Sequence, residues 1–279
     1  MGLVRVGLFI ITCALVLIAA GAAIPKLPDL WSQVILGVST SLVTFALTAL
    51  FARWDGLELK DAGAAVASRS WLRLAAGFLI GLGLVGLQVS VVGVVGHIRW
   101  VRSPEVGFNA TATSLAAYLV LSCREELAFR GYPLRRLDCL LGPYAAQLLV
   151  ALVFAIEHVA GGYSWTNAML GVATGSLVFG MAALATRGLA IPIGLHAAWN
   201  FGQWVLGGKE TLGLWRAVNP QELPAHLERV GMISYVIVMV FATFAFWCLY
   251  KRRMSNTHET VPTSVVKNRK LTNDPPRLF

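Results

Sequence analysis

Two adjacent carboxylates, Glu125 and Glu126, lie within an apolar stretch of the chain, AAYLVLSCREELAFRGYPLRRL. An ionisable side chain inside a membrane is costly, so it persists where it has a partner, faces a water-filled space or takes part in chemistry. Later apolar segments carry His158 in FAIEH and the pair His196 and Asn200 in HAAWN. Carboxylates, imidazoles and an amide in one set of helices indicate a catalytic site.

Helical geometry separates the roles of the two carboxylates. Glu126 and Arg130 are spaced i and i+4, so they share a helix face and can form an ion pair. Glu125 is rotated from its neighbour by about 100 degrees. We therefore expect Arg130 to hold Glu126, while Glu125 points at a cavity where a carboxylate can serve as a general acid or base. For Glu126 and Arg130 taken alone, a structural ion pair that ties helices together is an equal alternative.

The histidines occur in two further helical patterns. Phe154 and His158 share one face, where a lone histidine is often a packed core residue, and the adjacent Glu157 is a candidate for a supporting position or the mouth of the site. His196 and Asn200 also share a face and together offer two hydrogen-bond donors for an oxyanion. Equally, His196 is a candidate metal ligand with Asn200 as a weak partner.

The composition is that of a polytopic membrane protein. The chain is 57% hydrophobic and 13% charged, and its mean hydropathy is +0.68. Soluble proteins have about 25% charged residues. The net charge of +9 comes from Lys and Arg at the ends of apolar segments, which indicates topology determinants and a lipid bilayer rather than a nucleic-acid partner. The four cysteines are scattered, which favours packing roles over disulfides or a thiolate metal site.

Apolar segments of about 20 residues are long enough to cross a bilayer. They predict an all-α fold, a polytopic membrane helix bundle with about eight transmembrane helices: Val6–Ile24, Trp31–Phe51, Leu74–Val95, Ala112–Leu134, Tyr144–Ala160, Ala168–Thr186, Leu189–Leu206 and Gly231–Tyr250. The domain prediction is one membrane domain over 1–254, with a catalytic core at 112–206, and a disordered cytoplasmic tail over 255–279. The bias of Lys and Arg places both termini in the cytoplasm.

Three local features of the chain are predicted in addition. The first span is interpreted as a retained anchor, with a cleaved signal peptide as the alternative. The segment Gly56–Ser70 is a candidate amphipathic helix at the membrane interface. Pro192 and Gly194 are candidates for a kink in the seventh span.

The ordered set E-E-x-x-x-R, F-x-x-x-H and H-x-x-x-N resembles the CAAX protease and bacteriocin-processing (CPBP) family, also called the Abi family. The eukaryotic Ras-converting CAAX endopeptidase belongs to the same group. The resemblance rests on CREELAFRGYPLRRL, LVFAIEH and LAIPIGLHAAWNF, and it covers roughly Ala112–Leu206. It implies an intramembrane endopeptidase with an all-helical core.

The resemblance also implies a role for each residue. Glu125 and His158 would activate a water molecule for attack on the scissile peptide bond. His196 and Asn200 would stabilise the oxyanion. Glu126 and Arg130 would orient the site.

Family members are described both as metalloproteases and as metal-free glutamate enzymes. If this chain is metal-dependent, its ligands would be Glu125, His158 and His196, which form a plausible Zn²⁺ set. The metal-free mechanism is preferred because water activation by side chains alone already uses two of these three groups.

Other protease chemistries fit the sequence less well. It has no H-E-x-x-H zinc motif, no G-x-S-x-G nucleophile motif and no pair of Asp residues within the spans. A proton- or ion-coupled transporter could use the same residues as a relay, but no inverted repeat is visible. A non-catalytic bacteriocin-immunity or scaffold protein is the third alternative.

The expected partner is a peptide or membrane-protein substrate. The chain is expected to be a multi-pass protein of the cell membrane, in a bacterial inner membrane.

Overall fold

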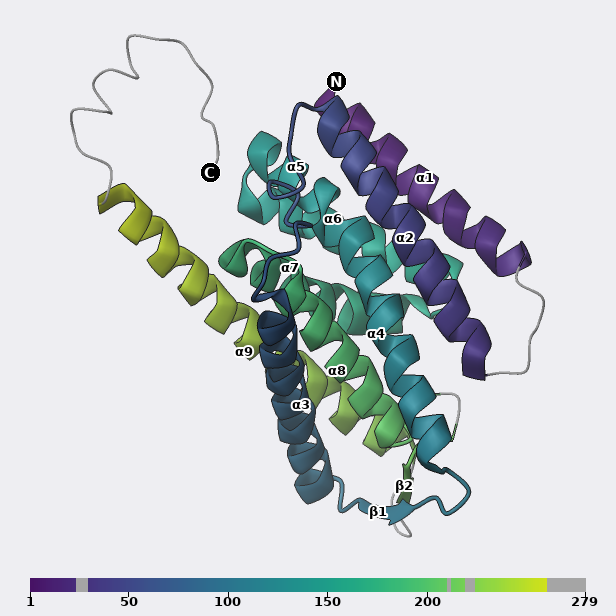
Figure 1. Ribbon diagram of the computed structural model, residues 1–279. Coiled ribbons are helices and arrows are strands. Elements are labelled where there is room, and N and C mark those ends of the chain that lie inside the picture. Colours follow the sequence, from purple (N-terminus) through teal and green to yellow (C-terminus); the bar gives the residue numbers. More distant parts are fainter. Residues whose placement is uncertain (24–29, 210–211, 219–223, 260–279) are drawn as a thin grey trace.

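A computed structural model describes residues 1–23, 30–209, 212–218 and 224–259 of the chain. The described residues form helices and one pair of short strands (Figure 1). In chain order the elements are α1 (Gly2–Ala23), α2 (Leu30–Trp54), α3 (Ser70–Val95), β1 (Arg99–Arg102), α4 (Phe108–Arg130), α5 (Tyr132–Leu141), α6 (Pro143–Ala160), the π-helix η1 (Asn167–Ala173), α7 (Thr174–Thr186), α8 (Ala190–Val205), β2 (Trp215–Val218) and α9 (Pro224–Glu259).

The predicted class, an all-α polytopic helix bundle, is confirmed. Each of the eight predicted spans overlaps a helix of the structure, although the fourth reaches into α5 and the sixth covers both η1 and α7. Within the described part of the chain, six helical segments are long and apolar enough to cross a membrane, with η1 and α7 counted as one. The other two predicted spans correspond to α4 and α8, in which polar site residues interrupt the apolar sequence.

The fourth predicted span ends earlier than expected. α4 stops at Arg130, and the chain turns at Gly131 into a separate amphipathic helix, α5, in which Leu134 and Leu137 are buried. Pro133 explains the break, because proline lacks the amide hydrogen that would continue the helical hydrogen bonding. The break leaves the polar C-terminal turns of α4 inside the bundle.

Two other boundary predictions need correction. The interfacial helix expected over Gly56–Ser70 is wrong, since this segment forms turns. Gly56 and Gly63 have positive φ angles of 71° and 68°, which end any right-handed helix. At the other end α9 continues to Glu259, so the first five residues of the predicted tail over 255–279 are helical. The rest of that tail, residues 260–279, lies outside the described residues.

Close backbone contact fixes α8 against α3, which lie side by side in Figure 1. A Cβ atom on Gly77 of α3 would lie 2.2 Å from the carbonyl oxygen of Ile191, and one on Gly194 of α8 would lie 2.1 Å from that of Leu74. Small residues permit this approach between membrane helices. Pro192 lies in the first turn of α8, where its missing amide hydrogen costs nothing. The helix is therefore continuous, and the kink predicted at Pro192 is absent.

The two ends of the bundle are closed differently. At one end Asp55, which follows α2, accepts hydrogen bonds from Arg5 of α1 and from Tyr132 (2.7 Å), and its carboxylate lies 2.9 Å from Arg136 Nε. Burial would raise the pKa of Asp55, but these partners together hold it below its ordinary value. At the other end β1 pairs antiparallel with β2, with Arg99 opposite Val218 (Figure 1).

Candidate active site

The last turns of α4 place a buried ion pair at the centre of the bundle. Glu126 and Arg130 have no exposed side-chain surface, and Arg130 Nη1 donates to Glu126 Oε1 at 3.2 Å. Arg130 Nη2 donates to Ser176 Oγ of α7 at 2.8 Å. The guanidinium also lies 4.4 Å from the centre of the Phe154 ring. The i and i+4 pair expected from the sequence is present. Through its contacts with Phe154 and Ser176, the Arg130 side chain also joins α4 to α6 and α7.

His196 of α8 lies between the two carboxylates. Its Nδ1 atom is 2.8 Å from Glu126 Oε1, and its Nε2 atom is 3.5 Å from Glu125 Oε2. The Phe179 ring of α7 stacks on the imidazole with centroids 4.4 Å apart and an interplanar angle of 15°. Two carboxylates and one aromatic ring thus fix the position and tilt of a nearly buried imidazole.

Glu125 differs from its neighbour in accessibility and in partner. Its side chain keeps 17% of its surface exposed, whereas that of Glu126 is fully buried. Arg124 Nη2 donates to Glu125 Oε1 at 3.0 Å, and Arg124 Nη1 lies 3.4 Å from Glu157 Oε1 of α6. Adjacent helix residues do not share a face, so spacing alone did not indicate a pair. The length of the arginine side chain allows Arg124 to reach the carboxylate of its neighbour Glu125.

His158 of α6 lies in the aromatic part of the same cluster. Its Nδ1 atom is 2.9 Å from the carbonyl oxygen of Phe154. A carbonyl only accepts hydrogen bonds, so Nδ1 carries the hydrogen and Nε2 is the nitrogen that can take a proton. The Phe154 ring lies 4.5 Å from the His158 ring and 6.3 Å from the His196 ring, between the two histidines.

Asn200 follows His196 by one turn of α8, and Lys209 is its partner. Lys209 Nζ donates to Asn200 Oδ1 at 3.0 Å. An ammonium group only donates, so the amide oxygen faces Lys209 and the amide NH₂ points the other way. Burial lowers the pKa of Lys209, and the negative charge of Glu125 partly offsets that effect. Lys209 follows the predicted span Leu189–Leu206, and the sequence alone indicated no role for it at the site.

The donor set resembles a metal site in one respect and differs in another. Each imidazole has Nδ1 hydrogen-bonded to an oxygen, as metal-bound histidines commonly do. Yet no three His, Cys, Asp or Glu side chains are arranged to hold an ion within the ranges that the structure describes. Glu125, His158 and His196, as placed, therefore do not fit a three-ligand Zn²⁺ centre.

The structure thus brings most of the predicted residues into one network. Direct contacts connect four of them: Glu125, Glu126, Arg130 and His196. The Phe154 ring links His158 to this group. Asn200 lies on the His196 face of α8 and contacts Lys209. The residues that sequence reasoning did not assign are Arg124, Ser176, Phe179 and Lys209. Their only signal in the sequence was a polar or aromatic residue in or beside an apolar segment.

Residues 107–202 match the family described as Type II CAAX prenyl endopeptidase Rce1-like. The matched segment is similar to the Rce1-like family. It runs from the start of α4 through most of α8 and holds all six predicted catalytic residues. Comparison with curated proteins found no significant match. This match, together with the membrane-helix bundle, supports a CAAX-type protease of the membrane as the general class of the protein.

Proposed function

We propose that the chain is an intramembrane endopeptidase in which side chains, without a metal ion, activate the attacking water. The observation that carries the proposal is the arrangement around His196. One imidazole nitrogen contacts a fully buried carboxylate, Glu126, and the other faces an accessible carboxylate, Glu125. An accessible base beside fixed hydrogen-bond donors is what hydrolysis of an amide requires.

Glu125 is the proposed general base. The water molecule donates a hydrogen bond to the Glu125 carboxylate and a second one to Nε2 of His158. As the water oxygen bonds to the scissile carbonyl carbon, its proton passes to Glu125. Arg124, 3.0 Å from the carboxylate, keeps the side chain in position and balances its charge before the transfer.

His196 and Asn200 are the proposed oxyanion donors. The carbonyl oxygen gains negative charge when its carbon becomes tetrahedral. The Asn200 NH₂ group points away from Lys209 and can donate to it. In its charged form His196 donates from Nδ1 to Glu126 and from Nε2 to the oxyanion. When the carbon–nitrogen bond breaks, Glu125 returns its proton to the leaving amine, so the base is regenerated.

The substrate proposed for this site is a peptide or the tail of a membrane-anchored protein. The location proposed for the enzyme is a bacterial inner membrane. The family description names CAAX prenyl endopeptidases, which makes a farnesylated peptide ending in a CAAX sequence the first specific substrate to test.

The experiment uses the purified full chain in detergent with two probes: a quenched-fluorescent peptide library and a quenched farnesylated CAAX peptide. Wild type should cleave at least one of them. Glu125→Ala and His158→Ala should each lower the rate by about 10²–10⁴-fold, the usual contribution of a general base. Glu105→Gln, which changes an exposed carboxylate in the loop before α4, is the matched control and should leave the rate unchanged.

Three results would contradict the proposal. One is the absence of cleavage of both probes by folded wild-type protein. Another is full activity in Glu125→Ala or His158→Ala. The third concerns the metal: dialysis against a tight chelator should leave the rate unchanged, whereas loss of activity that Zn²⁺ restores would show a metalloprotease.

A further inference from the structure

The C-terminal end of α7 attracts arginines from three other helices. Arg135 of α5 donates to the carbonyl oxygen of Ala183 at 2.7 Å, and Arg253 of α9 donates to that of Ala185 at 2.8 Å. Arg73 of α3 donates to the carbonyl oxygen of Thr186. A helix C-terminus carries only about half an elementary negative charge. Three guanidinium groups therefore meet the last carbonyl groups of α7, where the partial charge is negative.

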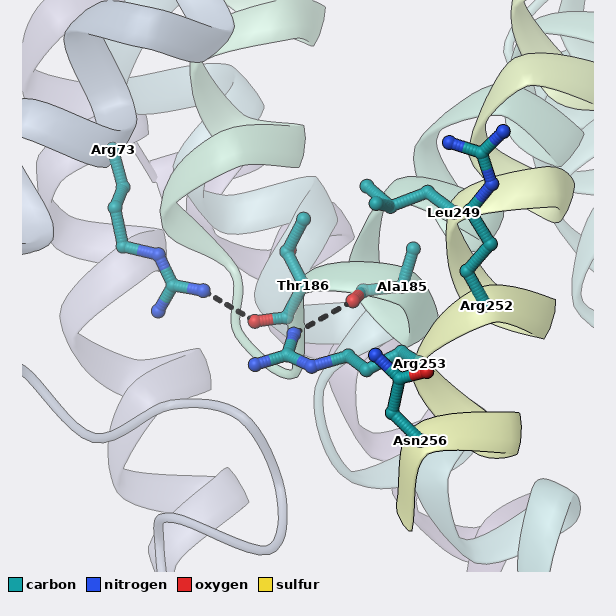
Figure 2. A pocket seen from close by; sticks show the side chains of 7 residues that line it. All are labelled: Arg73, Ala185, Thr186, Leu249, Arg252, Arg253 and Asn256. Carbon is teal, nitrogen blue, oxygen red and sulfur yellow. Dashed lines mark hydrogen bonds between the residues drawn. The ribbon is translucent and has the colours of Figure 1, made fainter. Parts of the chain in front are cut away.

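A cavity of about 270 Å³ lies beside these contacts (Figure 2). Its lining residues come from α3, α7 and α9: Arg73, Ala185, Thr186, Leu249, Arg252, Arg253 and Asn256. Among the described residues of this lining, every charged one is an arginine. Figure 2 shows the side chains of Arg73 and Arg253 reaching the end of α7 from opposite sides, with Arg252 one position earlier on α9.

The cavity lies where three candidate membrane spans end. α3 begins at Ser70, the η1–α7 span ends at Thr186, and the candidate span of α9 ends at Asn256. This is the end of the bundle that the distribution of Lys and Arg assigns to the cytoplasm, the side where anionic lipids attract basic residues. Leu249, which lines the cavity, and Phe244, earlier on α9, are exposed apolar residues on a helix long enough to run along lipid tails.

We propose that Arg73, Arg252 and Arg253, called here the arginine cluster, bind the negatively charged headgroup of an anionic phospholipid at this end of the bundle. Guanidinium groups pair with phosphate oxygens through two parallel hydrogen bonds. The exposed apolar side chains of α9 would contact the acyl chains. The site is separate from the cluster around Glu125, so this inference does not depend on the proposed protease function.

Native mass spectrometry of the full chain in detergent tests the proposal. Wild type should retain phosphatidylglycerol more strongly than phosphatidylcholine with the same acyl chains. Arg252→Gln should weaken phosphatidylglycerol binding about fivefold, since one basic residue near a membrane surface contributes about that factor. Arg252 is the first choice because Arg73 and Arg253 also cap α7. Arg102→Gln, an exposed arginine in β1 at the opposite end, is the matched control and should bind as wild type does.

The remaining outcomes would overturn the proposal. Equal binding of the two lipids by wild type would show that the arginine cluster does not recognise a phospholipid charge. An equal loss in Arg102→Gln and Arg252→Gln would place the binding elsewhere. Displacement of phosphatidylglycerol by inorganic phosphate at the same concentration would show an anion site that takes phosphate itself rather than a lipid.

Discussion

Nδ1 of His196 lies 2.8 Å from Oε1 of Glu126, a carboxylate with no exposed surface. The contact joins α8 to α4 and fixes which nitrogen of the imidazole faces Glu125. Arg130 binds the same oxygen atom of Glu126. The Glu126 carboxylate therefore holds the His196 ring in place and neutralises the charge of Arg130. Glu126 is therefore a positioning residue, and Glu125 is the residue expected to react.

Glu126→Gln should destabilise the fold. The substitution leaves the buried Arg130 guanidinium without its counter-charge, and removing one partner of a buried ion pair costs about 3–5 kcal/mol. Thermal unfolding in detergent, followed by circular dichroism, measures the loss. Glu125→Gln is the matched control, because that side chain is partly exposed, and it should unfold close to wild type. Equal unfolding temperatures for the two variants would contradict the assignment.

Lys209→Met should lower kcat about tenfold with little change in KM. The reason is that Asn200 loses the hydrogen bond that orients its amide, and a misplaced oxyanion donor contributes less to the transition state. Lys209→Arg should restore most of the rate. The measurement is steady-state cleavage of whichever peptide the wild type hydrolyses.

A double-mutant cycle separates this positioning role from a general loss of structure. In an Asn200→Ala background, Lys209→Met should have almost no further effect on kcat. A further loss of the full tenfold would mean that Lys209 acts independently of Asn200.

Gly77→Ala should lower stability by about 1–3 kcal/mol, the usual cost of overpacking. The added methyl group would meet the backbone of Ile191, which cannot move without shifting α8 and its site residues. Gly83→Ala, on the same helix with open space around it, should be neutral or slightly stabilising, because alanine favours helix. Chemical denaturation of both variants in detergent checks this. Equal loss in both would contradict the contact between α3 and α8.

Asp55 should make stability depend on pH in the acid range. Its folded pKa lies below the ordinary value of 3.8, so the ionised carboxylate stabilises the fold above about pH 4, and this contribution disappears as the pH falls through the folded pKa. Asp55→Asn should be less stable than wild type near neutral pH and should lose less stability on acidification. Denaturation midpoints across the acid range provide the measurement. Parallel pH profiles for the two proteins would contradict this role.

Hydropathy and helical spacing predicted much of this structure. Apolar length located the membrane helices, and the i and i+4 rule paired Glu126 with Arg130. These features depend on interactions within one helix or on transfer into the membrane, so a single sequence contains them.

Features that depend on contacts between distant segments could not be read from the sequence. Arg124 is one position before Glu125, and only the placement of α6 reveals that it also reaches Glu157. Lys209 belongs to a loop, and its contact with Asn200 depends on how the chain turns after α8. The break between α4 and α5 had a local signal in Gly131 and Pro133, but the apolar residues around it concealed that signal.

The central claim is that Glu125 is the general base, and one comparison tests it most directly. Glu125→Gln and Glu157→Gln each remove one carboxylate that Arg124 contacts, at 3.0 and 3.4 Å, so they perturb this arginine alike. Single-turnover cleavage of the same peptide should fall at least about 100-fold in Glu125→Gln and less than about fivefold in Glu157→Gln. Equal losses in the two variants, or the larger loss in Glu157→Gln, would contradict the assignment.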